Sequence, residues 1–299
     1  SVADQSQKAA AEFASHFDCT VATVHQIATA QAIDAVMICT PTDTHDALIR
    51  LYARHEKAIF CEKPIDLDPN RTRDCLIEIA QHKTRLMVGF NRRFDPHFAS
   101  LRHAIHEGRI GRPEMAILTS RDPQAPPLDY IRHSGGIFKD MMIHDFDMAM
   151  FLMNERPVKI QASGSVLTDP AIGQLGDYDS AAAILTMESG AQVMISNSRR
   201  SCYGYDQRIE VHGSHGMIRA ENQRPINIEL ANETGFTKPP LHDFFMTRYQ
   251  DAYRQEVSHF ITCIQQNTAM TPSGEDGLYA LELATAAASS AASGHAILL

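Results

Sequence analysis

Short apolar runs alternate with helix-forming segments over the N-terminal third of the chain. Residues 33–41 form a continuous apolar run that ends in turn residues, as expected of a strand buried on both faces. The runs at 58–64 and 85–89 repeat this pattern, with helix-forming segments at 46–55 and 76–82 between them. Because helices that separate short apolar strands are typical of parallel βαβ units, the pattern predicts a doubly wound parallel sheet.

A different pattern follows the glycine- and proline-containing segment at 108–113. Short alternating or apolar stretches are separated by Gly, Asn or Pro turns, which favours an antiparallel sheet. The predicted strands are 115–120, 158–166, 181–187, 192–198, 208–212, 217–220 and 226–230. A helix at 135–147 is inserted within this sheet, and helices at 245–265 and 275–289 close the chain.

The chain has 299 residues, enough for two domains. We expect an α/β domain at 1–114 and an α+β domain with a large, mainly antiparallel, open-faced sheet at 115–299. The formal net charge of -9 argues against nucleic acids and anionic membranes as partners, because both favour clustered Lys and Arg. No apolar run is long enough for a membrane span, and the six cysteines show no CxxC spacing. A cytoplasmic protein that acts on small molecules is therefore expected.

The segment at 135–147 carries three polar groups on a predicted helix. In a continuous helix Asp140 and His144 lie about one turn apart and Asp147 follows almost a turn later, so all three share one face. A carboxylate one turn from an imidazole can orient the ring and stabilise its charged form, which suits a general base. The same pattern fits a structural helix pair and, less often, half of a metal site, and the segment alone leaves these alternatives open.

Polar residues lie where two of the predicted parallel strands end. Thr40, Pro41 and His45 follow one strand, and Glu62 and Lys63 end the next. Ligands of doubly wound sheets bind outside the carboxyl ends of the strands, so we expect these residues near a ligand. Lys63 is the most informative of them, because the proline after it fixes the turn and holds the lysine at the strand end.

Residues 1–4 have the pattern of a buried strand that ends in an acid, Asp4. In a dinucleotide-binding fold, an acid at the tip of the second strand accepts hydrogen bonds from the adenosine ribose, and its charge favours NAD over NADP. The alternative is that Asp4 caps the helix predicted from residue 7. The local sequence supports both roles.

Three motifs together resemble a known enzyme family. They are Cys-Glu-Lys-Pro at 61–64, Gly-Phe-Asn-Arg-Arg-Phe-Asp at 89–95 and the segment at 135–147. With them the chain resembles the glucose-fructose oxidoreductase/inositol dehydrogenase/rhizopine-catabolism (Gfo/Idh/MocA) family over essentially its whole length. The segments at 119–123 and 203–210 are similar to its inositol dehydrogenase branch. The resemblance implies a Rossmann domain followed by a domain for substrate binding and oligomerisation.

The resemblance implies NAD-dependent oxidation of a cyclic polyol, such as myo-inositol to its 2-keto form. Lys63, Asp140 and His144 match the family's catalytic trio. In these roles His144 takes the proton from the reacting hydroxyl, Asp140 orients His144, and Lys63 stabilises the developing alkoxide while hydride leaves to the nicotinamide. The lysine supplies the positive charge, so no metal is expected. The cofactor-binding set is Asp4, Thr40, Pro41, His45, Glu62 and Lys63.

Matching motifs imply four residues that bind substrate hydroxyls. They are Arg93, Asp122, Asp147 and Tyr205, with Tyr203 a close rival of Tyr205. A structural role in a turn or rim is the alternative for each, although the predicted face shared with His144 favours function for Asp147. In the family the second-domain sheet also packs subunits together, so a homotetramer is expected. Another inositol isomer or an aldose is the alternative substrate.

The chain departs from the family pattern at its start. Family members begin with a strand, a G-x-G-x-x-G turn, a helix and a second strand, and nothing before Ser1 supplies them. The glycine turn brings backbone amides to the cofactor pyrophosphate, so we expect the printed chain to bind NAD poorly. Either about 35 N-terminal residues, the length of such a unit, precede the printed sequence, or the protein is a non-catalytic homologue that has lost its nucleotide half.

Overall fold

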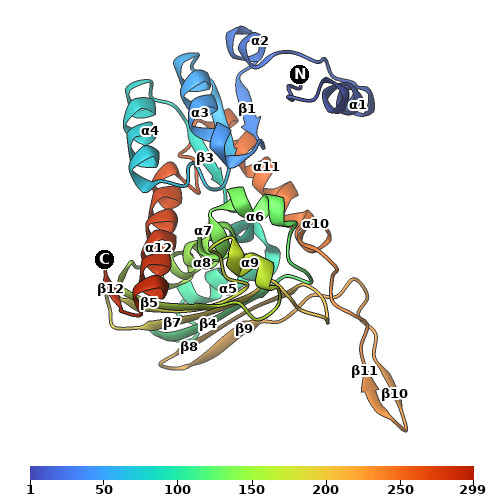
Figure 1. Cartoon of the computed structure of the whole chain (residues 1–299), viewed down its shortest axis with the longest axis vertical. Helices are drawn as coiled ribbons and strands as arrows, with labels where there is room; N and C mark the ends of the chain where they lie inside the picture. The colour runs from blue at the N-terminus through green and yellow to red at the C-terminus, as the bar shows by residue number, and fades with distance from the viewer. The chain divides into compact units, whose positions relative to one another are not determined.

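The computed structural model describes all 299 residues, which form two compact units (Figure 1). The first unit comprises residues 1–89 and 263–274, and the second comprises 90–262 and 275–299. Residues 90–114, which the sequence pattern assigned to the first domain, thus belong to the second unit. The reason is helix α5 (Pro96–His106), which buries Phe98 and Leu101 in the core of that unit.

The first unit contains the parallel sheet predicted from the apolar runs. Its three strands are β1 (Ala35–Ile38), β2 (Ala58–Glu62) and β3 (Leu86–Gly89), paired in the order β1-β2-β3. The central strand β2 is buried almost throughout, which explains its continuous apolar run. The helices of this unit are α1 (Gln7–Phe17), α2 (Val24–Thr29), α3 (His45–Arg54) and α4 (Pro69–Gln81). Helices α3 and α4 connect the strands, as a βαβ pattern requires.

Residues 1–4 do not form the predicted strand. Only Val2 pairs there, in an isolated parallel bridge with Val21. Asp4 is exposed, and its Oδ1 accepts a hydrogen bond from the backbone N–H of Ser6 at 2.7 Å. Ser6 in turn caps the N-terminus of α1. Asp4 therefore stabilises the turn that leads into α1. This role is close to the helix-capping role considered as the alternative, although Ser6 is the residue that caps the helix.

A seven-stranded mixed sheet forms the framework of the second unit, in the order β12-β5-β6-β7-β4-β8-β9. Its strands are β4 (Pro113–Arg121), β5 (Pro157–Ser165), β6 (Ser180–Met187), β7 (Gln192–Ser198), β8 (Asp206–Gly213), β9 (Gly216–Ala220) and β12 (Ile297–Leu298). All neighbours are antiparallel except β4 and β7, which pair in parallel. The sheet is therefore mainly antiparallel, as predicted.

Helices cover one face of this sheet and leave the other open (Figure 1). The covering helices include α5, α6 (Leu128–Ser134), α7 (Gly136–Asp140), α8 (Ile143–Met153) and α9 (Pro170–Gln174). On the covered face Leu118 and Val193 are completely buried, whereas Met115, Ile117 and Ile184 on the opposite face are 43 to 46% exposed. Because successive side chains of a strand point to opposite faces, this alternation produces the open-faced sheet.

The C-terminal part of the second unit differs from the sequence pattern in two places. The helix predicted at 245–265 is divided at Tyr249 into α10 (Phe245–Arg248) and α11 (Gln250–Gln266), and α12 (Gly274–Ser293) follows. The strand predicted at 226–230 is wrong for all but its last residue. That residue begins β10 (Leu230–Asn232), which pairs with β11 (Gly235–Thr237) in a separate hairpin.

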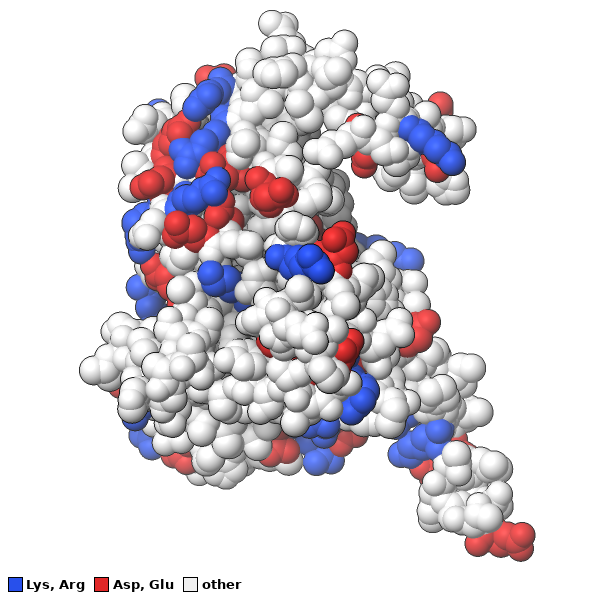
Figure 2. Space-filling view, viewed as in Figure 1, with Lys and Arg blue, Asp and Glu red and all other residues white.

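We call residues 226–238, which contain this hairpin, the arm. The arm projects from the rest of the second unit (Figure 1), and Figure 2 shows an uncharged stretch between its acidic tip and the charged side chains near its base. Its apolar side chains are strongly exposed: Ile226, Ile228 and Leu230 by 58 to 64%, and Phe236 by 78%.

None of the helices has the length and apolar character needed to cross a membrane.

Candidate active site

The carboxyl end of β2 carries Glu62 and Lys63 in the first unit. Lys63 follows the last residue of the strand and precedes Pro64 through a cis peptide bond. Burial raises the pKa of the Glu62 carboxyl, against the opposing charge of Lys63. A Cβ added to Gly89, at the end of the neighbouring β3, would lie only 3.1 Å from that carboxyl group. Glycine at this position therefore leaves room for the Glu62 side chain beside β3.

His45 joins two loops at the strand ends. It is 1% exposed, with Nδ1 2.8 Å from the carbonyl oxygen of Pro64 and Nε2 2.7 Å from that of Thr40. Both ring nitrogens are thus engaged inside the unit. The ring ties the loop after β1 to the loop after β2, which favours a positioning role over the direct cofactor contact predicted for His45.

The other predicted cofactor residues of this edge remain accessible. Thr40 and Pro41 are exposed, and the Thr40 hydroxyl lies 2.6 Å from that of Thr44. Glu62 and Lys63 are partly buried. Hydroxyl, carboxylate and ammonium groups at the carboxyl ends of parallel strands suit the ribose and phosphate groups of a dinucleotide. The residues present therefore fit such a cofactor.

The segment at 135–147 is not one continuous helix, contrary to the prediction. Helix α7 ends at Asp140 and α8 begins at Ile143. Between them, the carbonyl of Ile137 accepts hydrogen bonds from both Met141 and Met142, at 3.1 and 2.9 Å. This shared acceptor interrupts the regular i→i−4 ladder, and both methionines are buried in the core.

The three polar side chains of this segment differ in burial. Asp140 and His144 are partly buried, at the end of α7 and in the first turn of α8. Asp147 is 0% exposed and accepts hydrogen bonds from Arg93 on both carboxylate oxygens. Asp147 still follows His144 by three residues within α8, but its carboxylate is completely buried. Arg93 and Asp147 bind each other, and this favours the structural alternative for Asp147.

Two side chains from other elements hold Asp140. The hydroxyl of Tyr130, in α6, donates to Oδ1 at 2.8 Å, and Nη1 of Arg199, just after β7, donates to Oδ2 at 3.3 Å. The Phe90 ring stands edge-on to the His144 imidazole, with ring centroids 6.0 Å apart. The predicted acid–imidazole segment thus lies among polar and aromatic side chains of its own unit.

Asp122 and Tyr205 belong to the same unit. Tyr205 is 6% exposed and stands edge-on to Tyr249 at 6.0 Å. Burial raises the pKa of the Tyr205 hydroxyl, with the charge of Asp122 adding to this and that of Arg92 opposing it. Asp122 is partly buried just after β4.

Sequence reasoning missed a buried polar network centred on Asp145. Its carboxylate accepts hydrogen bonds from Arg92 at 2.7 Å, Ser120 at 2.6 Å and Asn197 at 2.9 Å. These residues come from α8, the turn after β3, β4 and β7. Asp145, directly before the apolar Phe146 in a helix expected to pack on a core, was the available signal, because a buried carboxylate needs a partner.

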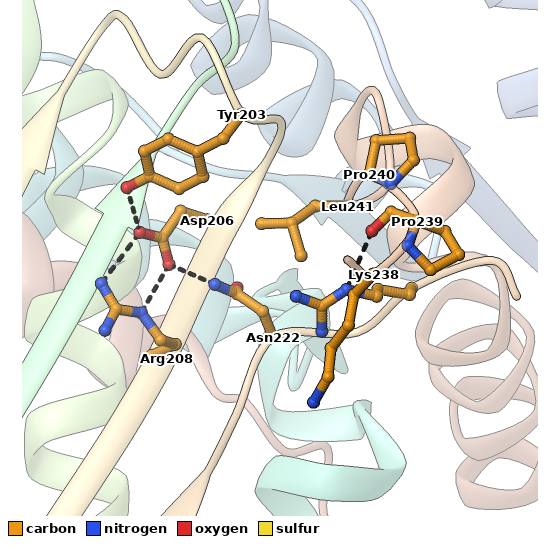
Figure 3. A pocket seen from close by; sticks show the side chains of 9 residues that line it. Tyr203, Asp206, Arg208, Asn222, Lys238, Pro239, Pro240 and Leu241 are labelled. Carbon is orange, nitrogen blue, oxygen red and sulfur yellow. Dashed lines mark hydrogen bonds and ion pairs between the residues drawn. The ribbon is translucent and has the colours of Figure 1, made fainter. Parts of the chain in front are cut away.

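Tyr203, the rival of Tyr205, lines a separate cavity of about 470 Å³ (Figure 3). Its hydroxyl donates to the buried Asp206 at 2.6 Å, and Arg208 and Asn222 bind the same carboxylate. Burial alone would raise the pKa of Asp206, but these hydrogen bonds hold it below its usual value. The cavity wall includes none of the residues predicted as catalytic.

The structure contains no group of three or more His, Cys, Asp or Glu side chains arranged to hold a metal ion.

Two family models match the chain. One, described as the NAD-binding Rossmann fold of an oxidoreductase family, matches residues 1–90, and the other, its C-terminal alpha/beta domain, matches residues 102–299. The chain belongs to this Gfo/Idh/MocA family. Its N-terminal part is accordingly an NAD-binding Rossmann fold.

Known members of the family are similar over nearly the whole chain. An inositol 2-dehydrogenase of Rhizobium meliloti (strain 1021) is 60% identical over 291 residues, which are 97% of this chain and 88% of that protein. A myo-inositol dehydrogenase from Corynebacterium glutamicum has a crystal structure with a TM-score of 0.96 at 38% identity, covering 99% of this chain and 90% of that one. A scyllo-inositol dehydrogenase from Lactobacillus casei, solved with bound NAD(H) and scyllo-inositol, has a TM-score of 0.92 at 25% identity, covering 99% and 89%.

Proposed function

We propose that the protein is an NAD-dependent dehydrogenase that oxidises myo-inositol to its 2-keto form. The observation that carries this proposal is the 60% identity with an inositol 2-dehydrogenase over 97% of the chain. The relative with bound scyllo-inositol makes another inositol isomer the second candidate substrate. Oxidation of the polyol is a first step towards its breakdown, so we assign the protein to inositol catabolism.

The catalytic roles follow the motifs. His144 accepts the proton of the reacting hydroxyl, and Asp140 orients and stabilises the resulting imidazolium. Lys63 stabilises the developing alkoxide with its positive charge. NAD, when bound, supplies the hydride acceptor. Thr40, Pro41 and Glu62 hold the cofactor at the strand ends of the first unit, Asp4 contributes to adenosine ribose binding, and His45 holds the loops.

Asp122 and Tyr205 are the proposed contacts for substrate hydroxyls, and Arg93 is a third. The partly buried Asp122 offers an acceptor for a polyol, and the hydroxyl of the buried Tyr205 offers a donor. Arg93 is held rigidly by Asp147 and Asp276, so its guanidinium fork keeps one orientation. Directional partners of this kind distinguish polyol isomers by the position of a single hydroxyl.

We further propose a cytoplasmic homotetramer. The open sheet face exposes Met115, Ile117 and Ile184, and the arm adds the exposed Phe236. Apolar surface of this extent favours contact with a second copy of the chain. All six cysteines are free thiols, which suits a reducing compartment. Light scattering after size-exclusion chromatography measures the oligomeric state, and a monomer at micromolar concentration would contradict the tetramer.

The test of the proposed function combines binding with turnover. NAD binding is measured by calorimetry, and NADH formation is followed with myo-inositol, scyllo-inositol, other inositol isomers and glucose. We expect NAD-dependent oxidation with the highest kcat/KM for myo-inositol. Faster oxidation of another isomer would reassign the substrate. A folded oligomer that binds no NAD and forms no NADH would fit a non-catalytic homologue, and equally an enzyme that needs residues before Ser1 to bind the cofactor.

A further inference from the structure

Arg199 is a completely buried arginine that no role assigned so far requires. It follows β7 and is 1% exposed, and its backbone N–H donates to the carbonyl of Asp179 at 2.8 Å. Burying a guanidinium is unfavourable unless anions pair with it. The position of those anions therefore indicates what the residue does.

The two anions lie at opposite ends of α7. Nη1 of Arg199 is 3.3 Å from Oδ2 of Asp140, the last residue of the helix. Nη2 is 3.3 Å from Oδ2 of Asp177, whose Oδ1 accepts the backbone N–H of Ile137 at 2.8 Å, in the first turn. One guanidinium thus links the start and the end of the helix that presents Asp140.

Gly136 shows how closely Asp177 approaches the start of α7. Its φ is +84°, which side chains rarely adopt, and a Cβ there would come within 2.7 Å of Oδ1 of Asp177. The Asp177 carboxylate is therefore held in a fixed position at the beginning of α7. Arg199 forms its second ion pair with this carboxylate.

The Asp140 carboxylate is held on both oxygens. Tyr130 of α6 donates to Oδ1 and Arg199 to Oδ2, so neither rotation nor displacement is free. Among the other charged or titratable groups, Asp177 before β6 contacts Arg199, and the charge of Asp122 after β4 acts on the Tyr130 hydroxyl. Lys139 and His144 lie close to Asp140 along the chain. Arg199 is the buried cation that directly contacts Asp140 in this set.

We propose that Arg199 is a positioning residue for the dehydrogenase reaction. It fixes the orientation of the Asp140 carboxylate and offsets part of its negative charge, and so sets how strongly His144 holds its proton. This inference rests on the proposed function, in which Asp140 acts on His144. Arg199 acts through Asp140, since its side chain is buried and its guanidinium pairs with Asp140 and Asp177.

The experiment compares Arg199→Gln and Arg199→Lys with Arg200→Gln, a matched control at the adjacent exposed arginine. For Arg199→Gln we expect kcat to fall about tenfold to a hundredfold, less than the loss of a general base, with KM for the polyol and Kd for NAD within about threefold of wild type. The acid limb of the kcat–pH profile should move to higher pH, because removing a cation strengthens proton binding at His144. Arg199→Lys should return the acid limb of the kcat–pH profile to its wild-type position, because the positive charge is kept. It should recover only part of kcat, because one ammonium cannot bridge two carboxylates.

A second readout needs no substrate. NMR titration of the His144 ring in the intact protein should show a higher midpoint in Arg199→Gln than in wild type and Arg200→Gln. If no polyol is oxidised, the proposed function fails, while this titration still decides the coupling of Arg199 to His144. Wild-type kcat and titration in a folded Arg199→Gln would overturn the inference. If that variant does not fold, wild-type kcat in Arg199→Lys would overturn it.

Discussion

The guanidinium of Arg93 holds both oxygens of the Asp147 carboxylate, with Nε 2.9 Å from Oδ2 and Nη2 2.6 Å from Oδ1. Asp147 is completely buried, and Asp276 approaches the same arginine at 3.1 Å. This pair joins the turn after β3 to α8, the helix that carries His144. The ion pair therefore holds the helix that carries His144 in place within the second unit.

Breaking this pair should destabilise the protein strongly. Asp147→Asn leaves the buried guanidinium with a weaker partner, so the free energy of unfolding should fall by about 3 to 5 kcal/mol in urea titrations. The double variant Arg93→Met with Asp147→Leu should recover part of this loss, because both charges are removed. Asp251→Asn serves as the control, since Asp251 pairs with Arg254 on the exposed surface and should change stability by less than about 1 kcal/mol. Equal stability of Asp147→Asn and wild type would show that the pair contributes nothing.

Replacing His45 should weaken cofactor binding without any direct contact to the cofactor. His45→Leu leaves the carbonyls of Thr40 and Pro64 without their ring partner, which should cost about 1 to 3 kcal/mol of stability. The loops after β1 and β2 then separate, and Kd for NAD measured by calorimetry should rise several-fold. His55→Leu, at the exposed end of the same helix, is the control and should leave both quantities near wild type. Wild-type NAD affinity in a folded His45→Leu would refute the positioning role.

The catalytic roles of His144 and Lys63 predict different kinetic signatures. His144→Ala should lower kcat by about two to four orders of magnitude, the usual scale for the loss of a general base. Lys63→Met should lower kcat while Kd for NAD stays largely unchanged, because its charge acts on the developing alkoxide. Steady-state kinetics and calorimetry separate the two effects. Unchanged turnover in His144→Ala would exclude its role as base, and a collapse of NAD binding alone in Lys63→Met would assign that lysine to the cofactor.

Asp179 should make stability depend on pH in the acid range. It is completely buried, and although burial alone would raise its pKa, the N–H groups of Leu167, Thr168 and Asp169 hold it down to about 2. A carboxyl with a lowered pKa contributes stability above its unfolded value of about 4, and this contribution is lost as the pH falls towards 2.

Asp179→Asn should therefore lower the free energy of unfolding by about 2 kcal/mol at neutral pH, and the difference from wild type should shrink between about pH 4 and pH 2. Urea unfolding at a series of pH values measures this difference. Asp169→Asn, at the partly buried start of α9, is the control for the loss of a nearby carboxylate. A difference that stays constant down to pH 2 would mean that Asp179 does not titrate in this way.

The sequence alone determined the layer structure of the protein. Continuous apolar runs mark β1, β2 and β3, and alternating patterns mark β4 to β9, because burial of one or both faces imposes a local period that can be read along the chain. The motifs around Lys63, Asp140 and His144 indicated the family and the chemistry, since they are contiguous. These features depend on near neighbours in the chain.

Only the tertiary structure decided how the polar residues are paired. Asp147 lies 54 residues from Arg93, and Asp140 lies 59 residues from Arg199, so no local pattern connects them. At the interruption between α7 and α8, Met141 and Met142 are both buried in a core that distant strands complete. Burial makes each unpaired charge costly, and the partner that relieves the cost is selected by proximity in space, which the sequence does not display.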